Sequence, residues 1–73
     1  MASIDISAPM AGTLKELLVA LGESVSVDQE LLIIESMKME IPLESPAAGS
    51  VVEILVEPPA HIEEGQLLLR IDA

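Results

Sequence analysis

The sequence predicts an all-β domain, folded as a small sandwich or flattened barrel with a pseudo-two-fold internal repeat. Its second half repeats the first at a constant offset of 37 residues. Short segments of strand-like composition are separated by turn residues every 8–12 positions or so, which is typical of sandwiches and barrels. The chain has 73 residues, with no cysteine and no aromatic residue, so Leu, Ile and Val must fill one small shared core.

The first half is expected to form a series of short strands. Residues 4–7 and 25–27 alternate apolar and polar side chains, as half-buried strands do. Residues 13–19 also have the apolar spacing of a short helix, but their counterpart at 50–56 is rich in β-branched residues and indicates a strand. Residues 30–35 include four successive apolar positions, and we expect this strand to be buried on both faces.

A β-hairpin is predicted between residues 30–35 and the apolar segment at 41–43. Lys38 lies at its tip, where a hydrated ammonium on a long stem is well accommodated. Met37 and Met39 flank it, although large apolar side chains usually lie in the core, and together they indicate a small adaptable surface for a partner. Pro42 has no N–H for a ladder hydrogen bond, so its strand is expected at a sheet edge.

The repeat organises residues 1–73 as one domain made of two matched halves, at about 8–36 and 45–73, joined by the hairpin region at 37–44. The identical pairs are Pro9 with Pro46, Ala11 with Ala48, Gly12 with Gly49, Glu16 with Glu53, Leu18 with Leu55, Val19 with Val56, Gln29 with Gln66, Leu31 with Leu68, Leu32 with Leu69 and Ile34 with Ile71. Neither half is large enough to bury its own apolar face, so the two are expected to share one core.

The charge balance disfavours nucleic acid as a partner. Thirteen acidic residues stand against Lys15, Lys38 and Arg70, giving a formal net charge of −10. Nucleic-acid binding requires basic groups that displace counterions, and single-strand binding uses aromatic platforms that this chain lacks. We therefore expect no nucleic-acid partner.

Neither a targeting segment nor a membrane span is expected. Residues 1–5 have no basic stretch leading into an apolar one, unlike a signal peptide. The longest apolar run, residues 17–21, is far shorter than the roughly 20 residues of a membrane helix. A cytoplasmic protein without a membrane partner is the simplest expectation.

The residues indicate a carrier rather than an enzyme. His61 is the only imidazole and has no partner in the sequence, so it is interpreted as a surface histidine without a role. Glu63 and Glu64 lie beside Gly65 in an expected turn, and Gly12 and Gly49 are interpreted as single turn glycines rather than a phosphate loop. No nucleophile with a base and no metal-ligand set is recognised, so neither a catalytic nor a metal site is predicted.

Met37-Lys38-Met39, placed between the two repeats, resembles the biotin-attachment motif of the biotinyl/lipoyl attachment domain family, and most closely its biotin carboxyl carrier members. The resemblance implies a flattened barrel–sandwich hybrid of two four-stranded antiparallel sheets, with the modified lysine on the hairpin that joins the halves. It implies covalent biotin on Lys38, with Met37 and Met39 forming the tip that a ligase recognises. Glu35 and Glu40 flank the tip and are candidates for ligase recognition.

The implied partners are a biotin protein ligase, a biotin carboxylase and a carboxyltransferase. In such a system the biotin ring accepts carboxylate at one site and delivers it at another, and tethering raises its local concentration at both.

Two alternatives stay open. A lipoyl carrier shares the fold and uses lipoate, although its lysine is typically preceded by Asp and followed by Ala, so the two methionines favour biotin. An unmodified lipoyl-like adaptor would use its acidic surface for protein contacts.

The sequence departs from the family pattern at three places. These are Ser36 in place of the commoner Ala, the Pro58-Pro59-Ala60 connection, and Asp28 in place of Gly. The turn at Asp28 is expected to be kept, because Asp tolerates the left-handed conformation.

Overall fold

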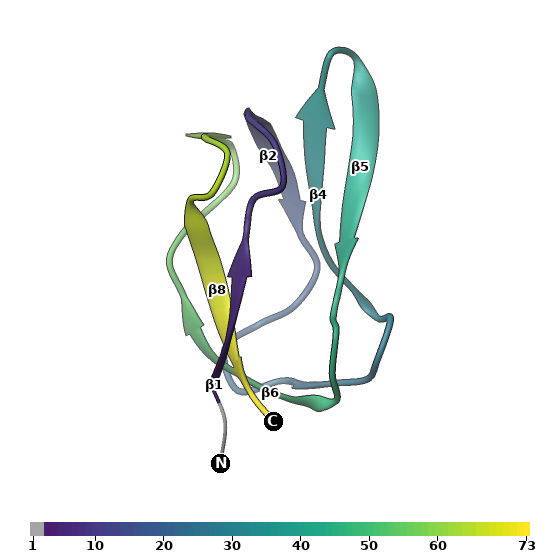
Figure 1. Cartoon of the computed structure of the whole chain (residues 1–73), viewed down its shortest axis with the longest axis vertical. Helices are drawn as coiled ribbons and strands as arrows, with labels where there is room; N and C mark the ends of the chain where they lie inside the picture. The colour runs from purple at the N-terminus through teal and green to yellow at the C-terminus, as the bar shows by residue number, and fades with distance from the viewer. Residues whose placement is uncertain (1–2) are drawn as a thin grey trace.

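The computed structural model describes residues 3–73 as two four-stranded antiparallel sheets packed face to face (Figure 1). The strands are β1 (Ser3–Ser7), β2 (Gly12–Leu17), β3 (Ser24–Val25), β4 (Glu30–Ser36), β5 (Met39–Glu44), β6 (Gly49–Ile54), β7 (Ala60–Ile62) and β8 (Leu67–Asp72). Sheet A has the order β1-β8-β6-β3, and sheet B the order β5-β4-β2-β7. The predicted fold class is confirmed.

The two sheets are equivalent under the 37-residue repeat. Strands β1, β8, β6 and β3 of sheet A correspond to β5, β4, β2 and β7 of sheet B, in the same order. Each sheet therefore contains strands from both halves of the sequence, and neither half can form its sheet alone. Within residues 3–73, no helix is long and apolar enough to cross a membrane.

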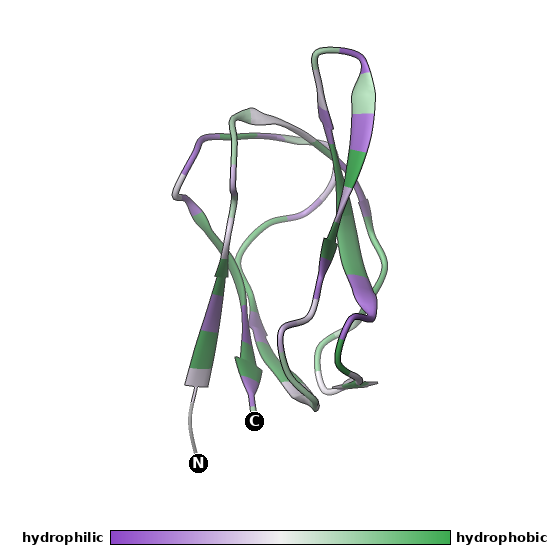
Figure 2. Cartoon of the chain, turned by 45° about the vertical axis from the view of Figure 1, so that its right-hand side comes forward, coloured by the Kyte–Doolittle hydropathy of each residue, from purple (hydrophilic) through white to green (hydrophobic). Residues whose placement is uncertain are grey.

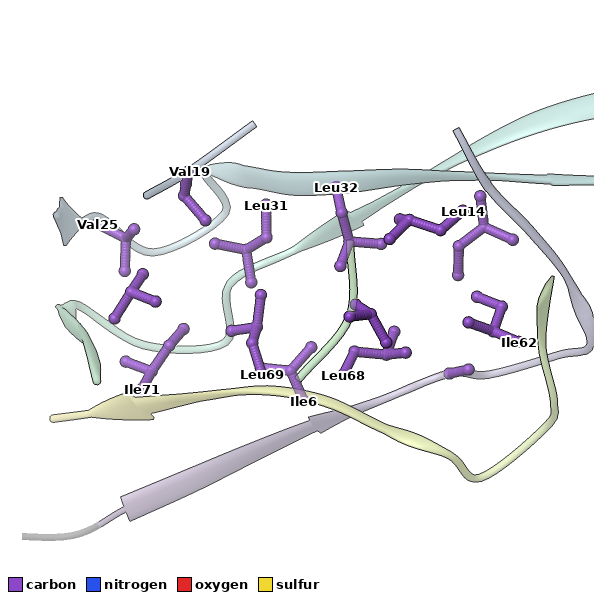
Figure 3. Close-up of a cluster of buried hydrophobic side chains, with 14 residues drawn as sticks. Ile6, Leu14, Val19, Val25, Leu31, Leu32, Ile62, Leu68, Leu69 and Ile71 are labelled. Carbon is purple, nitrogen blue, oxygen red and sulfur yellow. The ribbon is translucent and has the colours of Figure 1, made fainter. Parts of the chain in front are cut away.

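Two β-bulges at equivalent positions direct adjacent leucines into the core. The register of β4 with β5 skips Leu31, and the register of β8 with β1 skips Leu68. A bulge places two neighbouring side chains on one face, so Leu31 and Leu32 both face Leu68 and Leu69 of the opposite sheet (Figure 3). The expectation that residues 30–35 are buried on both faces is wrong, since Ile33 on the outer face is only half-buried.

The core is entirely aliphatic. Its buried members are Ile6, Ala8, Leu14, Val19, Val25, Leu31, Leu32, Ile34, Val51, Val56, Ile62, Leu68, Leu69 and Ile71. They come from both sheets and from the loops at the ends of the strands, so the layer between the sheets is continuous. Burial of this set is the main favourable term for folding.

The turn before β4 is built as predicted. Asp28 adopts a left-handed φ of 68°, and its equivalent Gly65 a φ of 84°. In the first turn the Gln29 N–H donates to the Ser26 carbonyl, and in the second the Gln66 N–H donates to the Glu63 carbonyl. Asp28 thus replaces the glycine without changing the turn.

Two further expectations are settled by strand boundaries. The strand predicted at residues 13–19 is observed as β2, which ends at Leu17. The Leu18 N–H still donates to the Leu31 carbonyl, and the chain then turns at Gly22, which has a φ of 87°. Pro42 lies in β5, which pairs only with β4 and forms the edge of sheet B, as predicted.

Candidate functional site

Lys38 lies on a two-residue turn at the tip of the β4–β5 hairpin. Pairing of the two strands continues to Ser36 and Met39, which leaves Met37 and Lys38 as the loop. Their φ values are 53° and 67°, and positive φ at both central residues is characteristic of a type I′ turn. For residues other than glycine this conformation costs about 1–2 kcal/mol each, so the pairing below must hold the turn in place.

The turn is exposed at one end of an elongated domain. Met37 is 91 % exposed and Met39 64 %, and Lys38 is also exposed. The domain measures 36 × 18 × 17 Å, and the hairpin tip lies at the opposite end of the long axis from the start of β1 and the end of β8 (Figure 1). Hydrophilic and apolar bands alternate along the hairpin up to this tip (Figure 2). The structure therefore confirms the predicted location of Lys38.

An ionic cluster lies directly below the turn, on the outer face of sheet B. Glu35 of β4 is paired opposite Glu40 of β5. The Lys15 ammonium of β2 lies 3.7 Å from Glu35 Oε2 and donates a 3.3 Å hydrogen bond to Glu40 Oε2. The hydrogen bond to Glu40, with the charge of Glu35, raises the pKa of Lys15 above its ordinary value. Lys15 was missed by sequence analysis, since it lies 25 residues from Glu40.

A groove borders the turn on the side of β2 and β7. We call it the hairpin groove; it is open to solvent and has a volume of about 460 Å³. Its lining residues are Ala11, Gly12, Thr13, Glu35, Ser36, Met37, Lys38 and His61. His61 pairs with Thr13, which pairs in turn with Glu35, so these three residues form a row across sheet B. His61 is exposed, as expected, but it lies beside the predicted site.

Gly12 permits the close approach of β2 to β4 just below the turn of the hairpin. A Cβ at this position would lie 2.5 Å from the carbonyl oxygen of Glu35, which is closer than any side chain tolerates. Gly49, its equivalent in sheet A, has the same relation to the Asp72 carbonyl. The interpretation of both as turn glycines is wrong: both begin strands, and both are required because a neighbouring backbone lies against them.

The structure brings Glu35, Met37, Lys38, Met39 and Glu40 together at one tip, as predicted from their positions in the sequence. Within residues 3–73, no group of three or more His, Cys, Asp or Glu side chains is arranged to hold a metal ion. The site thus consists of one exposed amine, a small apolar rim and an ionic cluster, on a two-sheet domain.

The chain is thus a small two-sheet β domain that holds a single lysine on the turn between its two repeats. The family model described as "Biotin-requiring enzyme" matches residues 2–71. The chain therefore belongs to the biotin/lipoyl attachment domain family, and the resemblance seen in the sequence is confirmed.

Relatives in this family differ greatly in length. The chain is 38% identical over 68 residues to the biotin/lipoyl attachment protein of Bacillus subtilis, covering 93% of both chains. It is 39% identical over 70 residues to the biotin carboxyl carrier protein of Streptococcus mutans, covering 96% of this chain and 54% of the relative. It is 39% identical over 67 residues to the pyruvate carboxylase of Staphylococcus aureus, covering 92% of this chain but only 6% of the carboxylase.

A solved structure of a single-chain, multi-domain long-chain acyl-CoA carboxylase contains the same fold. The match has a TM-score of 0.89 and 31% sequence identity, and it covers 93% of this chain and 7% of the carboxylase.

Proposed function

We propose that this chain is a biotin carboxyl carrier domain, with biotin attached through an amide to the Nζ atom of Lys38. The observation on which the proposal rests is the exposed Lys38, held between two methionines on the turn that joins the repeats, in a member of a biotin-requiring family. The two methionines favour biotin over lipoate, as argued from the sequence.

Lys38 is suited to acylation because nothing in the described chain competes for its amine. The ion pairs of residues 3–73 involve Lys15 and Arg70, and none involves Lys38. A lysine attacks an activated acyl group only as the free base. A biotin protein ligase must therefore remove the proton and supply a biotinyl adenylate; the nitrogen forms the amide bond, and AMP leaves with the electron pair of the broken acyl–phosphate bond.

The domain itself contributes the position of the Lys38 amine. The turn fixes the backbone of Lys38, so a docking enzyme does not have to order a mobile segment first. When bound, biotin supplies a ureido nitrogen that accepts and returns a carboxyl group. The proposed partners at these two stages are a biotin carboxylase and a carboxyltransferase, and the exposed rim of Met37 and Met39 is the surface that both would approach.

Intact-mass measurement after co-expression with a biotin protein ligase tests the proposal. The wild-type chain is expected to gain one biotinyl increment, and Lys38→Arg to gain none. Lys15→Arg is the matched control, because it removes the only other lysine side chain and should keep the increment.

A second candidate is a lipoyl carrier. It is favoured by the similarity to a protein named for both attachments, the biotin/lipoyl attachment protein. A lipoyl increment on Lys38 in the presence of a lipoate ligase, with no biotinyl increment, would replace the proposal by this alternative. A folded chain that takes neither group with several ligases would support an unmodified adaptor.

A further inference from the structure

Two like charges lie opposite each other at the base of the turn. Glu35 and Glu40 are cross-strand partners, and the next pair, Ser36 with Met39, closes the loop. Carboxylates placed directly opposite on one face of an antiparallel pair destabilise it. The turn above them contains two residues in a conformation that costs free energy. The tip of this hairpin would therefore be weakly held by β4 and β5 alone.

Lys15 opposes this repulsion from a third strand. The register of β2 with β4 skips residue 15 between Leu14 and Glu16, so Lys15 is the extra residue of a β-bulge. A bulge changes the direction of the side chain of its extra residue. The Lys15 ammonium lies 3.7 Å from the carboxylate of Glu35 and 3.3 Å from that of Glu40. We call this arrangement the Lys15 bridge. It joins β2, β4 and β5 on the outer face of sheet B.

Sheet A has a comparable bridge in a different place. Arg70 of β8 donates to Asp5 of β1 at 3.0 Å and to Glu53 of β6 at 2.7 Å. The position equivalent to Lys15 is Val52, which is the extra residue of the bulge between Val51 and Glu53. Val52 lies in sheet A, whereas the hairpin tip belongs to sheet B, so it provides a matched control position.

We propose that Lys15 is a positioning residue for the acylation of Lys38, because the Lys15 bridge holds the hairpin in the geometry that presents the amine. This inference rests on the proposed function. We call the hairpin closed when its strand pairs are formed up to the turn, and open when the pairs next to the turn are broken. For a ligase that binds only the closed hairpin, the apparent affinity is the intrinsic affinity multiplied by the fraction of molecules in which the hairpin is closed. Loss of the bridge should therefore raise KM for the domain and leave kcat unchanged.

The Lys15 bridge also makes the two lysines of the chain differ in their tendency to accept an acyl group. Its two carboxylates raise the pKa of Lys15, which lowers the already small free-base fraction of that amine at neutral pH. Lys38 has no ion-pair partner in residues 3–73. Selective attachment at Lys38 thus has a contribution from this chain, in addition to recognition by the ligase.

The test compares Lys15→Met, Lys15→Arg and Val52→Met by amide hydrogen exchange and by ligase kinetics. Lys15→Met removes the charge and keeps the apolar stem, and it should increase exchange at residues 35–40 about two- to tenfold, as expected for loss of two exposed ion pairs. Exchange at residues 67–72 in sheet A should not change. KM for a biotin protein ligase should rise, at constant kcat, by the factor by which the closed fraction falls, which is about twofold when half of the Lys15→Met hairpins are open. Lys15→Arg should restore both values, and Val52→Met should match the wild type.

Two additional measurements identify the cause. In Lys15→Met the excess exchange should diminish in 1 M NaCl, where the screening length is about 3 Å. Combining Lys15→Met with Glu40→Gln removes the repulsion and should bring exchange back toward the wild-type rate. Unchanged exchange or unchanged KM in Lys15→Met would overturn the inference, and so would a failure of Lys15→Arg to rescue.

The inference and the proposed function can fail separately. A wild-type chain that takes no biotin from any ligase refutes the proposed function, and with it the role of Lys15 in the attachment to Lys38. A wild-type chain that is biotinylated with the same KM as Lys15→Met refutes only the role of Lys15.

Discussion

Met37 and Lys38 adopt a backbone conformation that asparagine and glycine adopt more readily, with φ values of 53° and 67°. Residues kept in a sparsely populated conformation commonly mark functional sites. The strain is tolerated here because the strand pairing below continues up to Ser36 and Met39. We infer that the side chains, rather than the turn preference, determine which residues occupy these two positions.

Replacing Met37 with asparagine tests this interpretation. Met37→Asn relieves part of the left-handed strain, so the free energy of unfolding should rise by up to about 1 kcal/mol. The same change removes a 91 % exposed apolar side chain from the tip, and ligase kcat/KM should fall about tenfold if Met37 is an anchor for the ligase. Urea unfolding and ligase kinetics provide the two measurements. A more stable variant that is also biotinylated at the wild-type rate would exclude a recognition role for Met37.

The ionisation of Lys15 predicts a pH effect. Its pKa in the folded chain is raised by Glu40 and Glu35, so the stabilisation is complete below the ordinary value of 10.5 and is lost as pH rises through the folded pKa. Lys15→Arg keeps its charge in this range. The difference in Tm between the wild type and Lys15→Arg should therefore be constant up to about pH 10 and should turn against the wild type above it. A constant difference up to pH 12 would contradict the ion pairs.

Strands β2 and β6 begin with glycines that meet the backbone of their neighbours. Gly12 lies against Glu35 of β4, just below the turn of the hairpin, and Gly49 lies against Asp72 at the opposite end of the domain. Equivalent packing thus recurs in both sheets, but only the contact in sheet B adjoins the site. Substitutions at the two equivalent glycines can therefore be compared to distinguish an effect on overall stability from an effect on the attachment site.

Gly12→Ala and Gly49→Ala should each lower the free energy of unfolding by about 1–3 kcal/mol, because the added Cβ forces the strands apart. Under conditions in which both variants are folded, only Gly12→Ala should reduce the rate of biotin attachment. Thermal unfolding by circular dichroism gives the first quantity and intact mass against time the second. Equal attachment rates in the two variants would show that the contact between Gly12 and β4 does not control the geometry of the turn.

The domain as one body combines an interlocked core with a strongly acidic surface. Each sheet contains strands from both repeats, so the core of 14 buried aliphatic residues can form only when both halves fold together. Of the three cations, Lys15 and Arg70 form ion pairs between strands, and Lys38 forms none within residues 3–73. The net charge of −10 therefore exerts a repulsion that two bridges can offset only locally.

Salt should accordingly stabilise this protein. Screening weakens the repulsion among the 13 acidic residues more than it weakens the ion pairs of Lys15 and Arg70. Raising NaCl from 0.02 to about 0.5 M should increase Tm by about 4–8 °C, equivalent to about 1 kcal/mol for a domain of this size. KCl should act equally, and Glu63→Gln/Glu64→Gln, which removes two exposed charges, should reduce the effect. A fall in Tm with salt would show that the ion pairs outweigh the repulsion.

Pattern and periodicity were sufficient to predict the fold and the location of the central lysine. The 37-residue offset implied a shared core, Pro42 indicated an edge strand, and the Met37–Met39 segment indicated a hairpin tip, whereas the left-handed turn at Asp28 was implied by the family resemblance. All of these are confirmed by the strand order and backbone angles. They are predictable because each depends on neighbouring residues or on a repeat that is visible in one dimension.

The surroundings of that lysine became visible only in three dimensions. Lys15 meets Glu40 across 25 residues of sequence, and His61 joins Thr13 because β7 pairs with β2. The roles of Gly12 and of the inward-facing Leu31 likewise depend on strand neighbours and on bulges. Local composition does not encode these contacts, because strand order and register are fixed by closing the whole core, and a shift of one residue would turn each side chain to the other face.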